Sequence, residues 1–168
     1  MNRKKVTYLA HGAMIAAIYA AATYLSAAFA IAYGPVQFRL SEALAVLSVF
    51  TPAAIPGLTV GCIIGNITSP FGVWDIVFGS LATLIAAITA RALRNIRIKD
   101  IPILSILMPV IINAVIVGAE ITFLMPSQEA SLSAFAVAAL EVGASELAVC
   151  LAGGIPLFYA IRKTNIFK

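Results

Sequence analysis

Long apolar runs separated by short polar breaks dominate the chain. The runs predict six helices, at about residues 6–32, 40–50, 53–67, 74–92, 102–125 and 133–161. An α-helix needs roughly 20 apolar residues to cross the hydrocarbon core of a bilayer, and most of these runs reach or approach that length. The pattern therefore predicts an all-α membrane protein.

Composition supports this prediction and excludes other classes. The chain has 168 residues, of which 62% are hydrophobic and 11% charged, whereas soluble domains are about 45–50% apolar and about 25% charged. A soluble all-α fold of this size could not hide so much apolar surface. The basic residues flank apolar runs, which is typical of membrane edges and not of nucleic-acid binding. We expect residues 1–168 to form a single transmembrane substrate-binding domain.

The first run follows three basic residues, Arg3, Lys4 and Lys5. A signal peptide also begins with positive charge, and residues 26–30 resemble a cleavage site. However, the apolar region of a signal peptide spans only about 7–15 residues, and this run is longer. We expect a retained helix whose N-terminus lies in the cytoplasm.

Residues 40–67 could form one kinked span or two short ones, and the placement of charge decides between them. With two spans, ten basic residues lie on the inner side and only Arg39 lies outside; with one span, the counts become three inside and eight outside. The positive-inside rule favours the first arrangement. We therefore expect six transmembrane helices with both termini in the cytoplasm.

The predicted second helix is too short to span a bilayer alone. Its 11 residues would measure about 17 Å at ~1.5 Å per residue, against a core of about 30 Å. Short helices at membrane depth occur where protein surrounds them or a cavity is lined. The polar stretch 33–44 precedes and begins this helix, with a turn at Gly34-Pro35 and a good N-cap at Ser41. We interpret this stretch as the mouth of a small-molecule pocket.

Acidic residues gather in the predicted outer half of the molecule. They are Glu42, Asp75, Glu120, Glu129, Glu141 and Glu146, and Asp100 alone is on the inner side. An ionisable residue inside a bilayer costs about 2.5–3.5 kcal/mol or more and usually marks a functional path. Carboxylates can accept two N–H groups from one edge of a heterocycle or bind an ammonium group. The pattern favours a pocket for a flat, nitrogen-rich ligand.

Some of these polar and aromatic residues also have structural explanations. Glu129 fits a solvated loop, Glu42 could pair with Arg39, and Trp74 and Tyr33 could be interfacial anchors. His11, Cys62 and Cys150 sit in apolar runs without metal-type spacing, and we expect them to be structural. Glu120, Glu141 and Glu146 are the hardest to explain without a ligand.

Small residues recur every four positions on the first helix. One row is Ala13, Ala17 and Ala21, and the adjacent row is Gly12, Ala16 and Ala20. Such rows let another helix approach closely in lipid. The sequence leaves open which row packs within the protein and which contacts a partner.

Motifs for nucleotide binding and hydrolysis are missing. The chain has no Gly-x-x-x-x-Gly-Lys-Ser/Thr loop, no His-Glu-x-x-His and no Gly-x-Ser-x-Gly. No catalytic residue, cofactor or metal is therefore expected. An intramembrane enzyme that uses the carboxylates as acid and base stays open as an alternative.

Four segments give the chain a family resemblance. They are Tyr-Gly-Pro-Val-Gln-Phe-Arg-Leu-Ser-Glu-Ala-Leu (33–44), Pro-Ala-Ala-Ile-Pro-Gly-Leu (52–58), Asp-Ile-Val-Phe-Gly-Ser-Leu-Ala-Thr-Leu (75–84) and Asn-Ala-Val-Ile-Val-Gly-Ala-Glu (113–120). On the basis of these segments, the chain resembles the queuosine-precursor transporter family, which comprises the QueT-type S-components of energy-coupling factor (ECF) transporters. The resemblance extends over nearly the whole chain.

The resemblance implies a six-helix S-component bundle with an outward-facing ligand site. Residues 33–40 would form a lid, and the row that begins at Ala13 would contact a transmembrane coupling subunit driven by two cytoplasmic ATPases. The ligand would be a 7-deazaguanine such as the aminomethyl form or queuine. An S-component for another flat cationic vitamin, such as a thiamine precursor, is the alternative.

Combined with this resemblance, the residues suggest roles in the pocket. We expect Glu42, Glu120 and Glu141 to accept ligand N–H groups, with Asp75 and Glu146 in the same region. We expect polar contacts from Asn66, Asn113, Gln37 and Arg39, and ring stacking from Trp74, Phe38 and Tyr33.

Overall fold

The computed structural model describes residues 3–124, 130–164 and 166–167. Within these ranges the chain is helical and forms no strand beyond an isolated bridge between Ile98 and Ile101. The elements are α1 (Arg3–Ala28), η1 (Leu40–Val49), α2 (Ala54–Asn66), η2 (Asp75–Gly79), α3 (Ser80–Ala92), α4 (Ile103–Phe123), α5 (Leu132–Val149), η3 (Cys150–Gly154) and α6 (Ile155–Arg162).

These elements form six helical segments, as the apolar runs predict. η2 continues into α3, and α5, η3 and α6 make one long helix. Four segments are long and apolar enough to cross a membrane, whereas η1 and α2 are shorter apolar helices. Residues 40–67 thus form two separate helices, as predicted, whereas the crossing of the membrane by each of them stays a prediction.

Three helical segments depart from regular α-helical geometry. η1 is a 3-10 helix, so its ten residues span about 20 Å at about 2.0 Å per residue, further than an α-helix would. η2 and η3 are π-helical turns. η3 includes the Gly153-Gly154 pair, and π-helical turns inside α-helices often mark functional sites.

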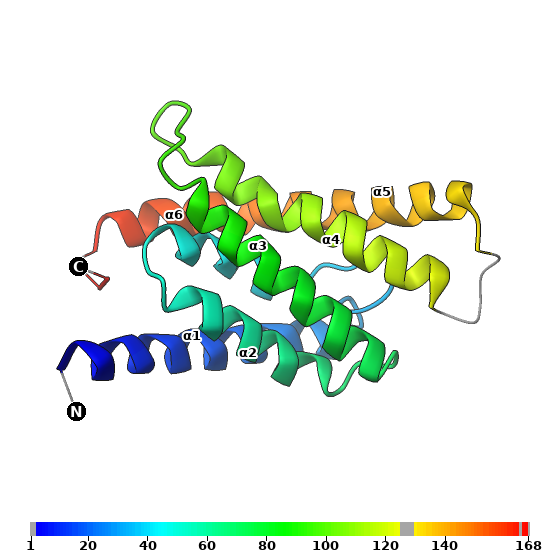
Figure 1. The fold of residues 1–168 in the computed structure, drawn as a ribbon, viewed down its shortest axis with the longest axis horizontal. Coiled ribbons are helices and arrows are strands. Elements are labelled where there is room, and N and C mark those ends of the chain that lie inside the picture. The colour runs from blue at the N-terminus through cyan, green and yellow to red at the C-terminus, as the bar shows by residue number, and fades with distance from the viewer. Residues whose placement is uncertain (1–2, 125–129, 165, 168) are drawn as a thin grey trace.

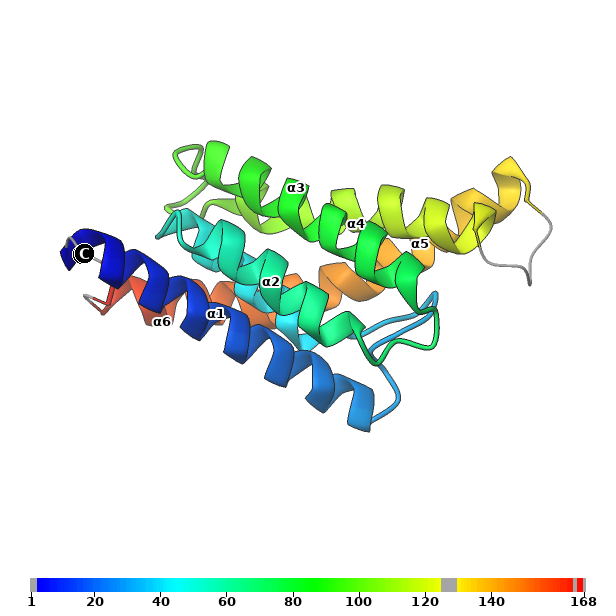
Figure 2. The same ribbon diagram turned by 60° about the horizontal axis from the view of Figure 1, so that its bottom comes forward.

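The helices run roughly along one axis (Figure 1). The start of α1, the loop between α3 and α4, and the end of α6 lie at one end of the bundle, and the loops before η1 and between α2 and α3 lie towards the other (Figures 1 and 2). We call the first the basic end, because the Lys and Arg residues other than Arg39 belong to it by sequence.

α1 and α2 pack closely through small residues (Figure 2). A Cβ atom added at Gly57 would lie 2.7 Å from the Gly12 carbonyl oxygen, and one added at Gly61 would lie 2.8 Å from the Ala16 carbonyl oxygen. Gly12 and Ala16 therefore belong to the row that packs within the protein. Ala13, Ala17 and Ala21, the adjacent row, are exposed.

Gly61→Ala is expected to destabilise the protein by about 1–3 kcal/mol, the usual cost of overpacking. The added methyl group would meet the Tyr19 Cβ atom at 2.7 Å and backbone atoms of Ala16, which cannot rotate away. Gly143→Ala is the matched control, since its methyl group would meet only the Ala114 Cβ atom at 3.4 Å. Thermal unfolding in detergent should show a lower midpoint for Gly61→Ala alone; equal midpoints would contradict the packing argument.

Candidate functional site

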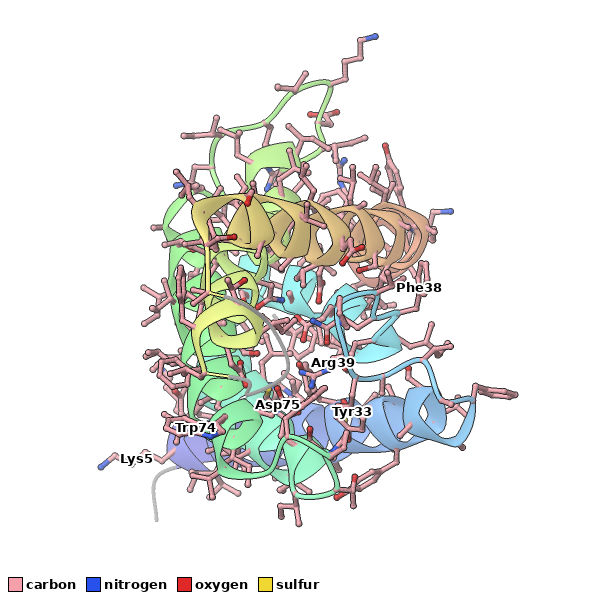
Figure 3. All side chains as sticks on the ribbon, turned by 90° about the vertical axis from the view of Figure 1, so that its right-hand side faces the viewer. Lys5, Tyr33, Phe38, Arg39, Trp74 and Asp75 are labelled. Carbon is pink, nitrogen blue, oxygen red and sulfur yellow. The ribbon has the colours of Figure 1, made fainter. Side chains whose placement is uncertain are left out.

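Arg39 lies at the centre of a buried polar cluster (Figure 3). Its Nε donates to the Ala32 carbonyl at 2.8 Å and its Nη2 to Asn66 Oδ1 at 2.7 Å. The same Nη2 is 3.6 Å from Asp75 Oδ2, and the guanidinium lies over the Tyr33 ring, 5.2 Å from its centroid. Arg39 thus connects the loop before η1 to the end of α2 and the start of η2.

Asn66 and Asp75 hold each other in place as well. The Asn66 side-chain amide donates to the backbone carbonyl of Asp75 at 2.8 Å, and the Ser69 hydroxyl donates to the Asp75 carboxylate. Gly79 makes room for this contact, because a Cβ atom there would lie 2.8 Å from Asn66 Nδ2. The loop between α2 and η2 is therefore fixed by the same groups that bind Arg39.

Glu42 enters the cluster from the first turn of η1. It is 2% exposed, and the hydroxyl of Tyr19 on α1 donates a hydrogen bond to Glu42 Oε1. The Asn113 amide on α4 is close enough to interact with the carboxyl groups of both Glu42 and Glu146. Four helical segments thus contribute to one group of polar side chains.

Glu120 and Glu146 carry unused hydrogen-bonding capacity. Each is 1% exposed. Among the described residues, neither carboxyl oxygen of Glu120 has a hydrogen-bond partner, and neither does Glu146 Oε2. Buried polar atoms are normally hydrogen-bonded, because an unpaired one costs about 1–3 kcal/mol or more. These atoms are the strongest structural indication of a ligand site.

The cluster is strongly acidic. Within the described part of the chain, Glu42, Asp75, Glu120 and Glu146 are buried, and Arg39 is the buried cation beside them. Burial alone would lower the pKa of the Arg39 guanidinium, but the surrounding groups outweigh burial and raise the pKa above its ordinary value; they are Cys62, Tyr19, Asp75 and Glu42. Arg39 therefore stays charged, and the remaining acids can stabilise a ligand that donates N–H groups or carries positive charge.

An apolar groove on the side of the bundle reaches one of these acids. It has a volume of about 390 Å³ and lies between the η2–α3 helix and α4. Its lining residues are Phe78, Leu81, Val115, Ile116, Ala119, Glu120, Phe123 and Leu124. Glu120 thus lies between the lateral groove and the central cluster.

The structure brings together most of the predicted polar residues. Glu42, Asn66, Asp75, Asn113, Glu120, Glu146, Gln37 and Arg39 are all buried. Gln37 joins the loop to α5, since its backbone N–H donates to Ser145 Oγ at 3.3 Å. Glu141 is exposed on α5 and stays outside the cluster. Glu129 lies outside the described residues.

Two of the three predicted aromatic residues, Trp74 and Phe38, are exposed. Trp74 is 47% exposed and pairs with Phe78 at a ring-centroid distance of 6.1 Å, and Phe38 is 38% exposed. Tyr33 is half-buried beneath Arg39, and its hydroxyl donates to the Gly65 carbonyl at 2.7 Å. Of the three, Tyr33 is the one that contacts the cluster.

Sequence reasoning missed Tyr19. It lies on the same face of α1 as Ala16 and Thr23, the face that packs into the protein. The available signal was a tyrosine in line with the small residues of that face, since a buried Tyr hydroxyl normally requires a hydrogen-bond partner. Among the described residues, no group of three or more His, Cys, Asp and Glu side chains is arranged to hold a metal ion.

Over most of its length, the chain is similar to a known protein family. Residues 9–163 match the family model described as QueT transporter. A curated relative, the queuosine precursor transporter QueT of Lactococcus lactis subsp. cremoris, is 38% identical over 85 residues. This alignment covers 51% of the chain and 50% of the relative, so the chain spans about half the length of the curated relative it matches. No solved structure matches.

The family match covers all six helical segments except the first residues of α1. Its description indicates a transporter and not an enzyme. Together with the four helices that are long enough to cross a membrane, it shows that the chain belongs to the QueT transporter family, as a multi-pass protein of the plasma membrane.

Proposed function

We propose that this protein is the substrate-binding S-component of an ECF-type importer for a queuosine precursor. The observation that carries the proposal is the set of unpartnered carboxyl oxygens of Glu120 and Glu146 inside the bundle. A 7-deazaguanine such as the aminomethyl form or queuine supplies both a row of N–H donors and a positive charge. The name of the Lactococcus relative, a queuosine precursor transporter, supports this ligand class.

The distribution of charge supports an orientation with the ligand site towards the outside. The basic end holds both ends of the described chain and the loop between α3 and α4 (Figure 1). The positive-inside rule places such an end in the cytoplasm. Glu42 and Asp75 begin their helical segments at the opposite end. Ligand would therefore enter from the outer side.

The loop before η1 has the contacts expected of a lid. Tyr33 bonds to the end of α2, Gln37 bonds to Ser145 on α5, and Arg39 bonds to Asn66. The Leu40 N–H donates to Ser26 Oγ on α1 at 3.0 Å. The loop thus connects three helices around the cluster, and opening it would require these bonds to break.

A partner surface is available on α1. Ala13, Ala17 and Ala21 are exposed, and a groove of about 240 Å³ between α1 and α2 runs beside Ala13. Small residues at four-residue spacing allow close helix packing in lipid. We assign this row to the transmembrane coupling subunit, whose two cytoplasmic ATPases would supply the energy for uptake.

Ligand binding by the purified protein tests the proposal. The protein in detergent is expected to bind 7-aminomethyl-7-deazaguanine or queuine with a Kd below about 1 μM, equivalent to about −8.2 kcal/mol. Isothermal titration calorimetry would measure the affinity, with thiamine and guanine as comparison ligands. A chain that binds thiamine but no deazapurine would be an S-component for another flat cationic vitamin. A chain that chemically converts any of these ligands would be an enzyme.

A further inference from the structure

The buried acids fall into two groups with different surroundings. Glu120 lies beside Asp75, whose carboxylate already has Arg39 at 3.6 Å and the Ser69 hydroxyl. Glu42 and Glu146 lie close enough to interact with each other and with the Asn113 amide. Within the described residues, no Lys or Arg comes within 4 Å of Glu42, Glu120 or Glu146.

The two groups also differ in the acceptors that they leave free. Both oxygens of Glu120 lack a partner, so the whole carboxylate can face two parallel N–H groups. Glu42 Oε1 accepts the Tyr19 hydroxyl, and Glu146 Oε2 has no partner. The second group therefore combines two buried carboxyl groups with one unpartnered oxygen, and does not offer a free two-oxygen edge.

We propose that the two groups bind different parts of one ligand: Glu120 accepts two N–H groups from a flat ring edge, and Glu146, supported by Glu42, binds a positively charged amine arm. This assignment rests on the proposed function, because it concerns the same site. It goes further by making the positive charge of the ligand, and not only its ring, a requirement for tight binding.

The physical reason is the cost of burying unpaired charge. A buried carboxylate without a cation is strongly unfavourable, whereas a hydrogen-bonded ion pair offsets much of that cost. The Arg39 guanidinium is already bonded to Ala32, Asn66 and Asp75. An ammonium group near Glu146 would supply the missing cation. A neutral arm would leave Glu146 Oε2 without a donor.

A pair of ligands with the same ring tests the assignment. 7-Aminomethyl-7-deazaguanine carries a cationic arm, and 7-cyano-7-deazaguanine carries a neutral one. Wild-type protein is expected to bind the amine about 100-fold more tightly than the nitrile, which corresponds to about 2.7 kcal/mol at 1.36 kcal/mol per tenfold. Calorimetry or a competition assay would measure the ratio.

Two variants then separate the roles of the acids. Glu146→Gln is expected to weaken binding of the amine at least tenfold and to leave the nitrile nearly unchanged. Glu120→Gln is expected to weaken both ligands by a similar factor, because both share the ring edge. Asp100→Asn is the control, since Asp100 is exposed at the basic end, and thermal unfolding would confirm that each variant is folded.

The possible failures are distinguishable. If neither deazaguanine binds the wild-type protein, the proposed function itself is wrong. If both bind equally well, the ligand class stands and the requirement for a cation is overturned. If Glu120→Gln changes the amine alone, the assignment of the two groups is reversed and therefore wrong. If Glu146→Gln does not fold, the ratio of the wild-type affinities for the amine and the nitrile still tests whether binding requires a cation.

Discussion

Arg39→Met is expected to destabilise the protein by about 3–5 kcal/mol, the usual cost of removing one partner of a buried ion pair. Arg39 is 6% exposed, and its loss would leave the Asp75 carboxylate buried without its cation. The substitution also removes the donors to Ala32 and Asn66. Ligand binding should be lost too, because the loop before η1 would lose its anchor. Thermal unfolding in detergent and calorimetry would measure the two effects.

The chain contains a matched control for this prediction. Arg162 and Asp100 form the other ion pair among the described residues, at 3.8 Å, but both side chains are exposed. An exposed pair contributes about 0–1 kcal/mol, so Arg162→Met should have little effect on unfolding. Asp75→Asn added to Arg39→Met should recover part of the stability, because it removes the unpaired charge. Similar unfolding midpoints for Arg39→Met and Arg162→Met would contradict the anchoring role.

This role changes the interpretation of Arg39 and Asn66 that the sequence alone suggested. Both were expected to contact the ligand. In the structure, Arg39 Nε and Nη2 and the Asn66 amide bond to the protein itself. Their first effect is therefore to position the loop and the start of η2, and direct contact of either residue with a ligand stays a prediction.

The sequence predicted the number of helices well because one strong constraint decides it. The positive-inside rule uses only the positions of Lys and Arg relative to the apolar runs, and these positions can be read directly from the sequence. The 3-10 geometry of η1 and the π-turns at η2 and η3 depend on how neighbouring segments pack. No local pattern specified them, since tertiary contacts override local preference.

Helical geometry explains which acids and aromatics reach the cluster. Glu141 and Glu146 are five residues apart, about 140° around a helix of 3.6 residues per turn, so they point in different directions. Glu146 is buried and Glu141 is exposed. Trp74 precedes Asp75 by one residue and likewise faces away from it. The sequence located all of these residues in the same half of the molecule, but which of them faces the interior depends on the rotation of each helix about its axis.

The same rotation decides the roles of the two small-residue rows on α1, which the sequence left open. Ala16 is 6% exposed, and a Cβ atom at Gly61 would lie 3.1 Å from its Cα atom. Ala17 is the next residue, yet it is exposed. One row is therefore needed for the fold, and the other remains available for the proposed coupling subunit.

Enlarging one alanine in each row should therefore give opposite results. Ala17→Leu is expected to leave ligand binding and unfolding unchanged, but to weaken co-purification with the coupling subunit and ATP-dependent uptake by about tenfold or more, because the added side chain keeps the partner helix away. Ala16→Leu is expected to destabilise the protein itself by about 1–3 kcal/mol through overpacking. Pull-down, uptake in proteoliposomes and thermal unfolding would measure these effects.

Ala144→Leu on α5 controls for a larger side chain at an exposed position elsewhere. It should change neither stability nor co-purification. If Ala17→Leu behaved like Ala144→Leu, the alanine row would not be the partner surface, although the ligand site could still be correct. If Ala17→Leu instead lowered the unfolding midpoint as much as Ala16→Leu, both rows would pack inside the protein. Only a loss of uptake with stability and ligand binding retained connects the exposed face of α1 to transport, because that result separates ligand capture from its delivery across the membrane.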